Sequence, residues 1–176
     1  MIYVLQVAPH EENQIENIFR EFMPSSLCQR FFHPMRRISK KFHGEWVETS
    51  EKILPGYVFV ETNEPEEFYK RLKTIPRLTK MLGKSYNDSI SAWEFIGLSV
   101  EETEWLENIM SCGENNEVKL SCVKRDEFGN IKVISGPLLY LADKVKKIDL
   151  HRRIAKVELS FGQKQSLLYF GIEIVD

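Results

Sequence analysis

The sequence has little cysteine and no long hydrophobic run. Its three cysteines, Cys28, Cys112 and Cys122, are odd in number and lack the spacing of metal ligands. We therefore expect reduced thiols and a cytoplasmic protein. No apolar run approaches the roughly 18 residues of a membrane-spanning helix, and the first residues lack the basic start and cleavage site of a signal peptide. The expected protein is soluble and has no membrane partner.

Sequence signatures of catalysis are also absent. There is no nucleophile elbow, phosphate-binding loop, zinc-protease helix or C-x-x-C pair. The four histidines are isolated from one another and from cysteine, so we predict no metal and no other cofactor. Cys28 has two interpretations, a nucleophile activated by a nearby arginine or a buried and inert thiol, and the second is favoured. His33 is interpreted as structural, and we expect that the protein is not an enzyme.

Charge is distributed unevenly along the 176 residues, although the formal net charge is only −2. Residues 87–111 contain six acidic side chains and no basic one. Residues 144–156 contain six lysines or arginines against the single acid Asp149, which is a local charge of +5. Such a segment favours an anionic partner, nucleic acid above all. The alternative is an ordinary solvated hairpin.

The amino-terminal part alternates strands and helices around residues 53–61. Pro55 and Gly56 predict a turn, and the four β-favouring residues that follow predict a central strand with Tyr57 and Phe59 on one face. Helices are predicted at 10–22, at 65–75 and from Ser99 onwards. Further strands are predicted at 2–7, 28–37, 45–52 and 78–82, with a basic tip at 40–44.

The carboxy-terminal part shows no helical period. Short strands are predicted at 118–124, 131–135, 144–149, 155–160 and 165–175, with turns between them. Several short strands in about 60 residues indicate a small barrel. The polar segment 112–117 is interpreted as a domain boundary.

Several stretches resemble a known family. Residues 3–7, 54–60 and 76–83 (PRLTKMLG) resemble the NGN domain of NusG-family transcription elongation factors. Residues 131–138 (IKVISGPL), with 145–149 and 155–159, resemble a KOW motif. The resemblance implies an α+β fold. Residues 1–111 would form an NGN α/β sandwich with an antiparallel sheet flanked by helices, 112–117 a linker, and 118–176 a small SH3-like KOW β-barrel.

Within the family, the pattern K-K-I-D-x-H-x-R at 146–153 and the ending GIEIV at 171–175 are most similar to the LoaP branch of specialised antiterminators. This resemblance implies that the NGN domain docks on the clamp helices of RNA polymerase while the KOW domain binds nascent RNA, a leader hairpin being the implied target. The residues expected at the polymerase face are Val4, Gln6, Leu54, Pro55, Tyr57 and Phe59. The residues expected to contact RNA are Lys40, Lys41, Lys144, Lys146, Lys147, His151, Arg152, Arg153 and Lys156.

Two alternatives stay open at this point. The protein could be a general NusG-like elongation factor whose KOW domain binds a ribosomal protein or a termination factor. It could also be a free-standing RNA-binding or ribosome-associated KOW protein that uses only its barrel. The expected setting is a bacterial cytoplasm, and the expected state is a monomer.

Overall fold

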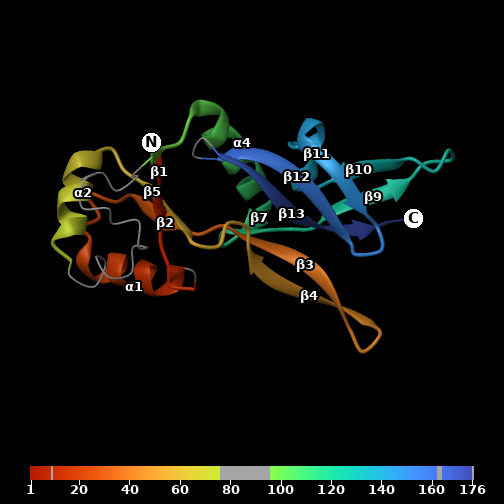
Figure 1. Ribbon diagram of the computed structural model, residues 1–176, viewed down its shortest axis with the longest axis horizontal. Coiled ribbons are helices and arrows are strands. Elements are labelled where there is room, and N and C mark those ends of the chain that lie inside the picture. The colour runs from red at the N-terminus through yellow and green to blue at the C-terminus, as the bar shows by residue number, and fades with distance from the viewer. Residues whose placement is uncertain (9, 76–95, 162–163, 176) are drawn as a thin grey trace. The chain divides into compact units, whose positions relative to one another are not determined.

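The computed structural model describes residues 1–8, 10–75, 96–161 and 164–175 (Figure 1). They form two compact units, one of Met1–His33 and Leu54–Ser99, the other of Pro34–Ile53 and Val100–Asp176. The domains predicted from sequence follow chain order, whereas these units do not, because residues 34–53 and 100–111 group with the carboxy-terminal part. The predicted domain boundaries themselves stay a prediction. The mixed α+β fold class is confirmed.

The first unit is an antiparallel sheet with two helices on one face. Its strand order is β2 (Arg30–Phe32), β5 (Tyr57–Glu61), β1 (Ile2–Gln6), β6 (Ile96–Gly97). The helices are α1 (Glu12–Phe22) and α2 (Pro65–Lys73). Val58 and Val60 pack in a buried cluster with Ile15 and Phe19 of α1 and Phe68 of α2. Alternation along β5 therefore directs Tyr57 and Phe59 to the opposite face of the sheet.

Gly56 connects the ends of β1, α1 and β5 through its backbone. Its N–H donates to Oε1 of the buried Glu12 at 2.7 Å, and its carbonyl accepts the N–H of Val7 at 2.8 Å. Its φ is +84°, and an added Cβ would lie 3.3 Å from the Val7 carbonyl oxygen. A glycine avoids the steric cost of that conformation, and the buried carboxylate gains a charge-assisted hydrogen bond. The turn predicted at Pro55-Gly56 thus sets the start of β5.

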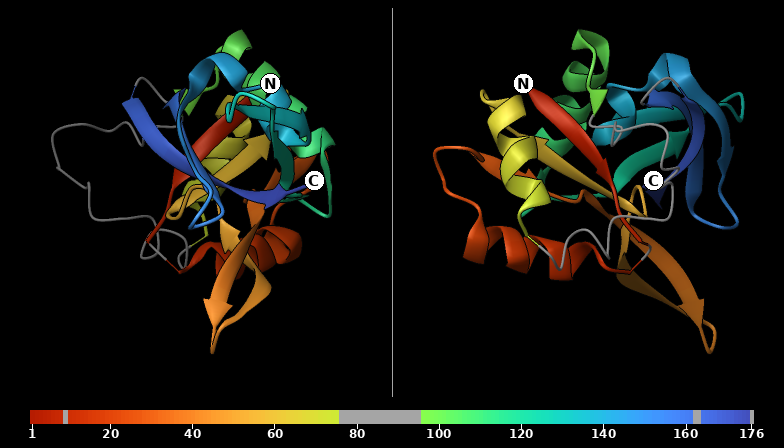
Figure 2. Two further views of the ribbon diagram at one scale, coloured as in Figure 1. Left: turned by 90° about the vertical axis from the view of Figure 1, so that its right-hand side faces the viewer. Right: turned by 60° about the vertical axis from the view of Figure 1, so that its left-hand side comes forward.

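The second unit contains a five-stranded β-sheet and a second, four-stranded sheet (Figures 1 and 2). The first is ordered β10 (Ile131–Ser135), β9 (Ser121–Arg125), β13 (Lys164–Ile174), β12 (Ile154–Phe161), β11 (Val145–Asp149). The second is ordered β4 (Glu45–Lys52), β3 (Met35–Phe42), β8 (Glu117–Val118), β7 (Gly113–Glu114). Helix α4 (Val100–Ser111) and two 3-10 turns, η1 (Pro137–Leu139) and η2 (Ala142–Lys144), complete the unit. Its buried core includes Val123, Leu138, Val157, Phe170 and Ile172.

The β3–β4 hairpin packs on the barrel strand β13. A Cβ added to Gly171 of β13 would lie 2.4 Å from the carbonyl oxygen of Arg37 and 2.9 Å from the Cα of Ile38. The two backbones therefore approach more closely than any side chain at this position allows. The hairpin then extends beyond the barrel strands (Figure 2).

Several predicted elements need correction. The single strand predicted at 28–37 is wrong, because β2 ends at Phe32 and β3 begins at Met35 in the other unit. Pro34 between them has no N–H for a sheet ladder, and the His33 N–H donates to Glu16 Oε1 at 3.1 Å instead. The strand predicted at 118–124 divides into β8 and β9, and the polar segment 112–117 contains β7. The predicted strand 78–82 and the whole of segment 76–83 lie outside the described residues.

The other predicted helices and strands appear with bounds shifted by a few residues. Helices α1, α2 and α4 correspond to the three predicted helices, and β10 to β13 correspond to four predicted strands. Among the described helices, none is long and apolar enough to span a membrane.

Gly136 supports a stability prediction with a matched control. Its backbone has φ 90° and ψ −173°, a region that is essentially restricted to glycine. An added Cβ would lie 2.7 Å from the Ser121 Cα and 2.8 Å from the Leu120 carbonyl oxygen. Gly129 also has a positive φ of +82°, but nothing lies within 4 Å of its added Cβ.

We predict that Gly129→Ala lowers the free energy of unfolding by about 1 kcal/mol, the cost of the positive φ alone. Gly136→Ala should lower it by about 3 kcal/mol or more, because steric overlap is added to the backbone strain. Urea unfolding followed by circular dichroism measures both values. Equal losses for the two variants would contradict the close packing around Gly136.

Candidate nucleic-acid interface

The basic segment 144–156 forms η2, β11, a turn and the start of β12. Within this segment Lys147 pairs with Lys156 across the strands, and Asp149 pairs with Ile154. Four of the predicted basic residues are exposed: Lys146, Lys147, His151 and Arg152. Three are half-buried: Lys144, Arg153 and Lys156. The structure therefore places the predicted cations along one strand–turn–strand element.

The turn at 149–153 is held by hydrogen bonds on both sides. Asp149 Oδ1 accepts the N–H of Arg152 at 2.9 Å, and this bond lowers the pKa of Asp149. The carbonyl of Arg153 accepts the N–H of Ile172 at 3.0 Å. Arg153 has a φ of 53°, which is uncommon for a residue with a Cβ. The turn is thus a defined scaffold for its basic side chains.

Arg153 also brings the hairpin tip and the basic turn together. Its guanidinium carbon lies 4.3 Å from the centre of the Trp46 ring on β4, a cation–π contact. Lys41 on β3 is the cross-strand partner of Trp46. The predicted RNA contact at Lys41 is therefore near the predicted contacts of the barrel turn, whereas Lys40, the cross-strand partner of Val47, is directed to the opposite face of the hairpin. Trp46 was missed by the sequence analysis, although an aromatic residue next to the basic tip was the available signal.

Ion pairs neutralise part of this surface. Lys144 Nζ lies 2.7 Å from Glu101 Oε1 on α4, and Lys146 Nζ lies 2.8 Å from Glu158 Oε2. The ammonium of Lys144 lowers the pKa of the Glu101 carboxyl. Lys40 is paired with Glu51 in the same way.

Other cations have no acidic side chain of the described residues within ion-pair distance, although Lys147 and Arg152 interact with Asp149 over a longer range. Among the described residues, no ion pair is formed by Lys41, Lys147 or Arg152. These three and Arg153 are the cations best placed to meet an external anion. Together with Trp46 and His151 they define what we term the basic surface.

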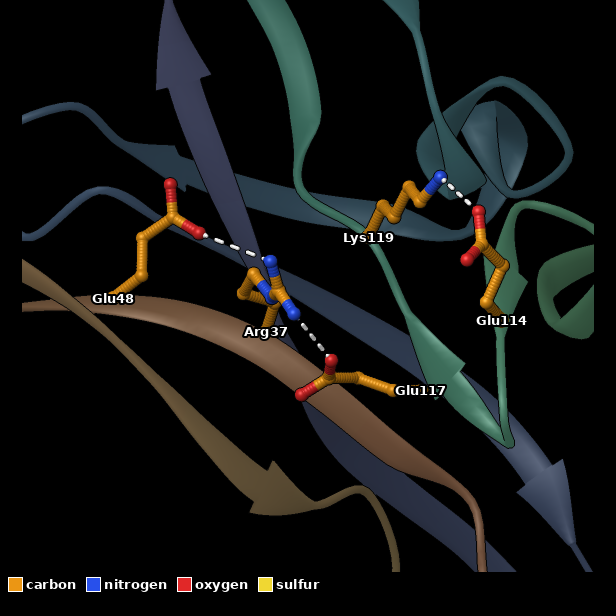
Figure 3. Close-up of polar contacts among 5 residues, drawn as sticks. All are labelled: Arg37, Glu48, Glu114, Glu117 and Lys119. Atoms are coloured by element: carbon orange, nitrogen blue, oxygen red, sulfur yellow. Dashed lines mark hydrogen bonds and ion pairs between the residues drawn. The ribbon is translucent and has the colours of Figure 1, made fainter.

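A polar cavity of about 420 Å³ also lies in the second unit, between the hairpin and the β7–β8 segment. Arg37 bridges Glu117 at 2.6 Å and Glu48 at 3.5 Å, and Lys119 lies 3.0 Å from Glu114 (Figure 3). The Ser50 hydroxyl and Arg37 lower the pKa of Glu117. Since the charged groups around this cavity neutralise one another, we assign it a structural role in joining β8 to β3.

Four of the predicted polymerase residues lie on the sheet face of the first unit that is opposite α1 and α2, whereas Leu54 and Pro55 precede β5. Val4 pairs with Phe59, and Gln6 pairs with Tyr57, so all four share this face. Phe59 is fully buried and stacks on Phe32 at 5.4 Å between ring centres.

Exposure separates the predicted polymerase residues into two groups. Val4 and Leu54 are buried with Phe59, whereas Gln6 and Pro55 are exposed and Tyr57 is half-exposed. A buried aromatic pair thus underlies a more polar, accessible edge. Any direct contact would come first from Gln6 and Tyr57 on this face and from Pro55, two residues before Tyr57 in the chain.

Cys28 and His33 have structural surroundings. Burial raises the pKa of Cys28 to about 11, and its Sγ lies 3.5 Å from the Arg30 carbonyl oxygen. The nucleophile interpretation of Cys28 is therefore disfavoured. His33 Nδ1 lies 2.5 Å from Glu16 Oε1, which links α1 to the end of β2. Within the described ranges, no group of three His, Cys, Asp or Glu side chains could hold a metal ion.

We predict that Cys28 reacts with iodoacetamide at pH 8 at least about 100-fold more slowly than Cys112 or Cys122. The reason is that Cys28 is buried with a pKa of about 11, so almost none of it is thiolate. Mass spectrometry of timed digests measures the three rates, and denaturation in urea should make them similar. Rapid alkylation of Cys28 in a folded Cys112→Ser/Cys122→Ser variant would contradict the buried thiol.

Comparison with known proteins extends over both units. A family model described as "Transcription termination factor nusG" matches residues 2–98. "Transcription termination/antitermination protein NusG" of Rickettsia bellii (strain RML369-C) is 26% identical over 167 residues, covering 92% of this chain and 82% of the relative. The protein of the same name from Haemophilus influenzae (strain ATCC 51907 / DSM 11121 / KW20 / Rd) is 23% identical over 183 residues, covering 94% and 93%. That of Halalkalibacterium halodurans is 22% identical over 167 residues, covering 92% and 90%.

Proposed function

Because the chain belongs to the NusG family of transcription termination and antitermination factors, we propose that it is a specialised, LoaP-like processive antiterminator. In this proposal the first unit docks on the clamp helices of RNA polymerase. The second unit binds nascent RNA, and the favoured target is a hairpin in an operon leader. The protein performs no chemistry of its own and acts by stabilising the elongating polymerase.

The observation that carries the RNA-binding part is the basic surface of the second unit. Lys41, Lys147 and Arg152 have no internal ion pair among the described residues, so their charges are free to neutralise phosphates. Lysine supplies a compact charge that fixes position, whereas arginine adds forked donors and a plane that can stack on a base. The turn that carries Arg152 is already held by Asp149, so little ordering is needed on binding.

The polymerase-docking part is supported by the aromatic sheet face of the first unit. Tyr57, Gln6 and Pro55 offer a partly polar edge, and the Phe59–Phe32 stack holds the strand behind it. An aromatic anchor with a polar rim is a common design for binding a helical partner. Phe59 then contributes through the position of β5 and not through a surface contact.

We predict that binding of the full chain to an RNA stem-loop weakens with salt, with a log–log slope of about −3 to −5 for about four to six neutralised phosphates. Lys147→Ala should make the slope shallower by about one and weaken all RNAs alike. Arg152→Ala should instead reduce the preference for the stem-loop over a scrambled single strand. Fluorescence anisotropy across a salt series measures each quantity.

Lys132→Ala is the matched control for this experiment, because Lys132 is an exposed lysine of β10, outside the basic surface, that is paired with Asp126. Its slope should equal that of the wild type. A salt-independent wild type, or a Lys147→Ala variant that behaves like the control, would contradict RNA binding. It would favour a general NusG-like factor whose barrel binds a protein.

We also predict that Tyr57→Ala weakens binding to RNA polymerase by about 2–4 kcal/mol, the range of an interface aromatic anchor. Phe59→Ala is a poor probe, since removing a buried phenyl ring costs about 3–5 kcal/mol of stability by itself. Phe22→Ala is the control, because Phe22 is exposed on α1, which packs on the other face of the sheet. Biolayer interferometry with core polymerase measures the affinities, and equal affinity for wild type and folded Tyr57→Ala would reject this docking face.

A further inference from the structure

Trp46 occupies an unusual position for a large aromatic side chain. It lies near the tip of the β3–β4 hairpin, it is 36% exposed, and its cross-strand partner is Lys41. It does not belong to the buried core of the second unit. Its ring contacts a cation, since the guanidinium carbon of Arg153 lies 4.3 Å from the ring centre. The pair forms a planar, partly exposed surface of an indole and a guanidinium.

Arg153 is held in this position at a conformational cost. Its φ of 53° is a left-handed backbone conformation that glycine or asparagine adopts more readily. The hydrogen bond from the Ile172 N–H to the Arg153 carbonyl uses only backbone atoms, so a glycine would keep it. The backbone of this position does not require an arginine, and the arginine side chain lies over Trp46. Strained residues of this kind occur preferentially at functional positions.

The charge around the pair selects an anionic ligand. Lys41 on the hairpin is exposed and is the cross-strand partner of Trp46. His151 and Arg152 are exposed in the turn, directly before Arg153 in the chain. Two acidic groups of the same elements already have partners: Asp149 accepts a bond from the Arg152 backbone, and Glu48 is paired with Arg37. The exposed acid Glu45, next to Trp46, is outnumbered by Lys41, Arg152 and Arg153. An aromatic plane beside unpaired cations is the arrangement with which proteins bind exposed bases.

We propose that Trp46 and Arg153 form a stacking platform for one unpaired base of the bound RNA, while Lys41 contacts an adjacent phosphate. The inference rests on the proposed RNA binding and specifies the structural feature of the RNA that is recognised. A continuous duplex hides the faces of its bases, whereas a loop or a bulge presents one. The platform therefore distinguishes a stem-loop from a duplex of equal charge.

The test uses the full chain and two RNA probes. One is a stem-loop with 2-aminopurine at a loop position, and the other is a continuous duplex of the same length with 2-aminopurine inside a strand. Stacking on Trp46 and Arg153 should quench the fluorescence of the loop probe. Trp46→Ala should abolish the quenching and weaken stem-loop binding by about 10- to 100-fold, the range for loss of one base–aromatic stack. Duplex affinity and the salt slope should stay unchanged, because no charge is removed.

Three further variants separate stacking from folding and from charge. Trp46→Phe should keep most of the quenching, because a smaller aromatic plane remains. Arg153→Lys should keep the salt slope and reduce the preference for the stem-loop, because the charge remains without the plane. Phe128→Ala is the matched control, since Phe128 is an 87% exposed aromatic residue in the β9–β10 turn. It should behave like the wild type.

The possible results decide between this inference and the proposed function. If Trp46→Ala and Arg153→Lys bind and quench the stem-loop like the wild type, the platform is rejected and RNA binding by other cations stands. If the wild type binds neither probe at low salt, both the platform and the proposed RNA binding are rejected. Loss of quenching in Trp46→Ala, with retention in Trp46→Phe and Phe128→Ala, supports the platform.

Discussion

The close approach of β13 to β3 is the constraint on which the second unit depends. At Gly171 the backbone of the barrel lies against Arg37 and Ile38, where even a methyl group would overlap with backbone atoms. The next residue, Ile172, donates its N–H to the carbonyl of Arg153. Two neighbouring residues of one strand thus hold the hairpin on one side and the basic turn on the other. The Arg153–Trp46 contact follows from this shared support.

Much of the local structure was predictable because it follows from periodicity and from turn residues. The apolar stripe of α1 and the β-favouring run of β5 identified the first unit, and the Gly136-Pro137 turn marked the barrel. Strand alternation also predicted that Tyr57 and Phe59 share a face, as the pairing with Gln6 and Val4 shows. Short-range patterns were sufficient in each of these cases.

The remaining features depend on contacts between residues that are distant in sequence. No local pattern indicates that β3 and β4 leave the first unit after Pro34, or that Trp46 meets Arg153. Alternation gives the face on which Phe59 lies but not what stacks on it, so its burial against Phe32 was not predicted. The pairing of Lys144 with Glu101 likewise depends on how α4 packs within the second unit. The period of the hydrophobic residues indicates whether a segment is a helix or a strand and which of its faces is buried. It does not indicate which other element packs against that face.

The order in which the chain leaves and re-enters each unit has a consequence for folding during synthesis. Residues of the first unit are complete once Ser99 has emerged, but the β3–β4 hairpin belongs to the second unit and packs on β13, which is synthesised much later. Contacts across such a long separation form slowly, because the loop entropy is lost before the contact is gained. Since domains fold as they are synthesised, the first unit can fold before the second unit has been completed. The basic surface appears only when the last described strand is in place, so a ribosome that stalls before β13 leaves a chain without it.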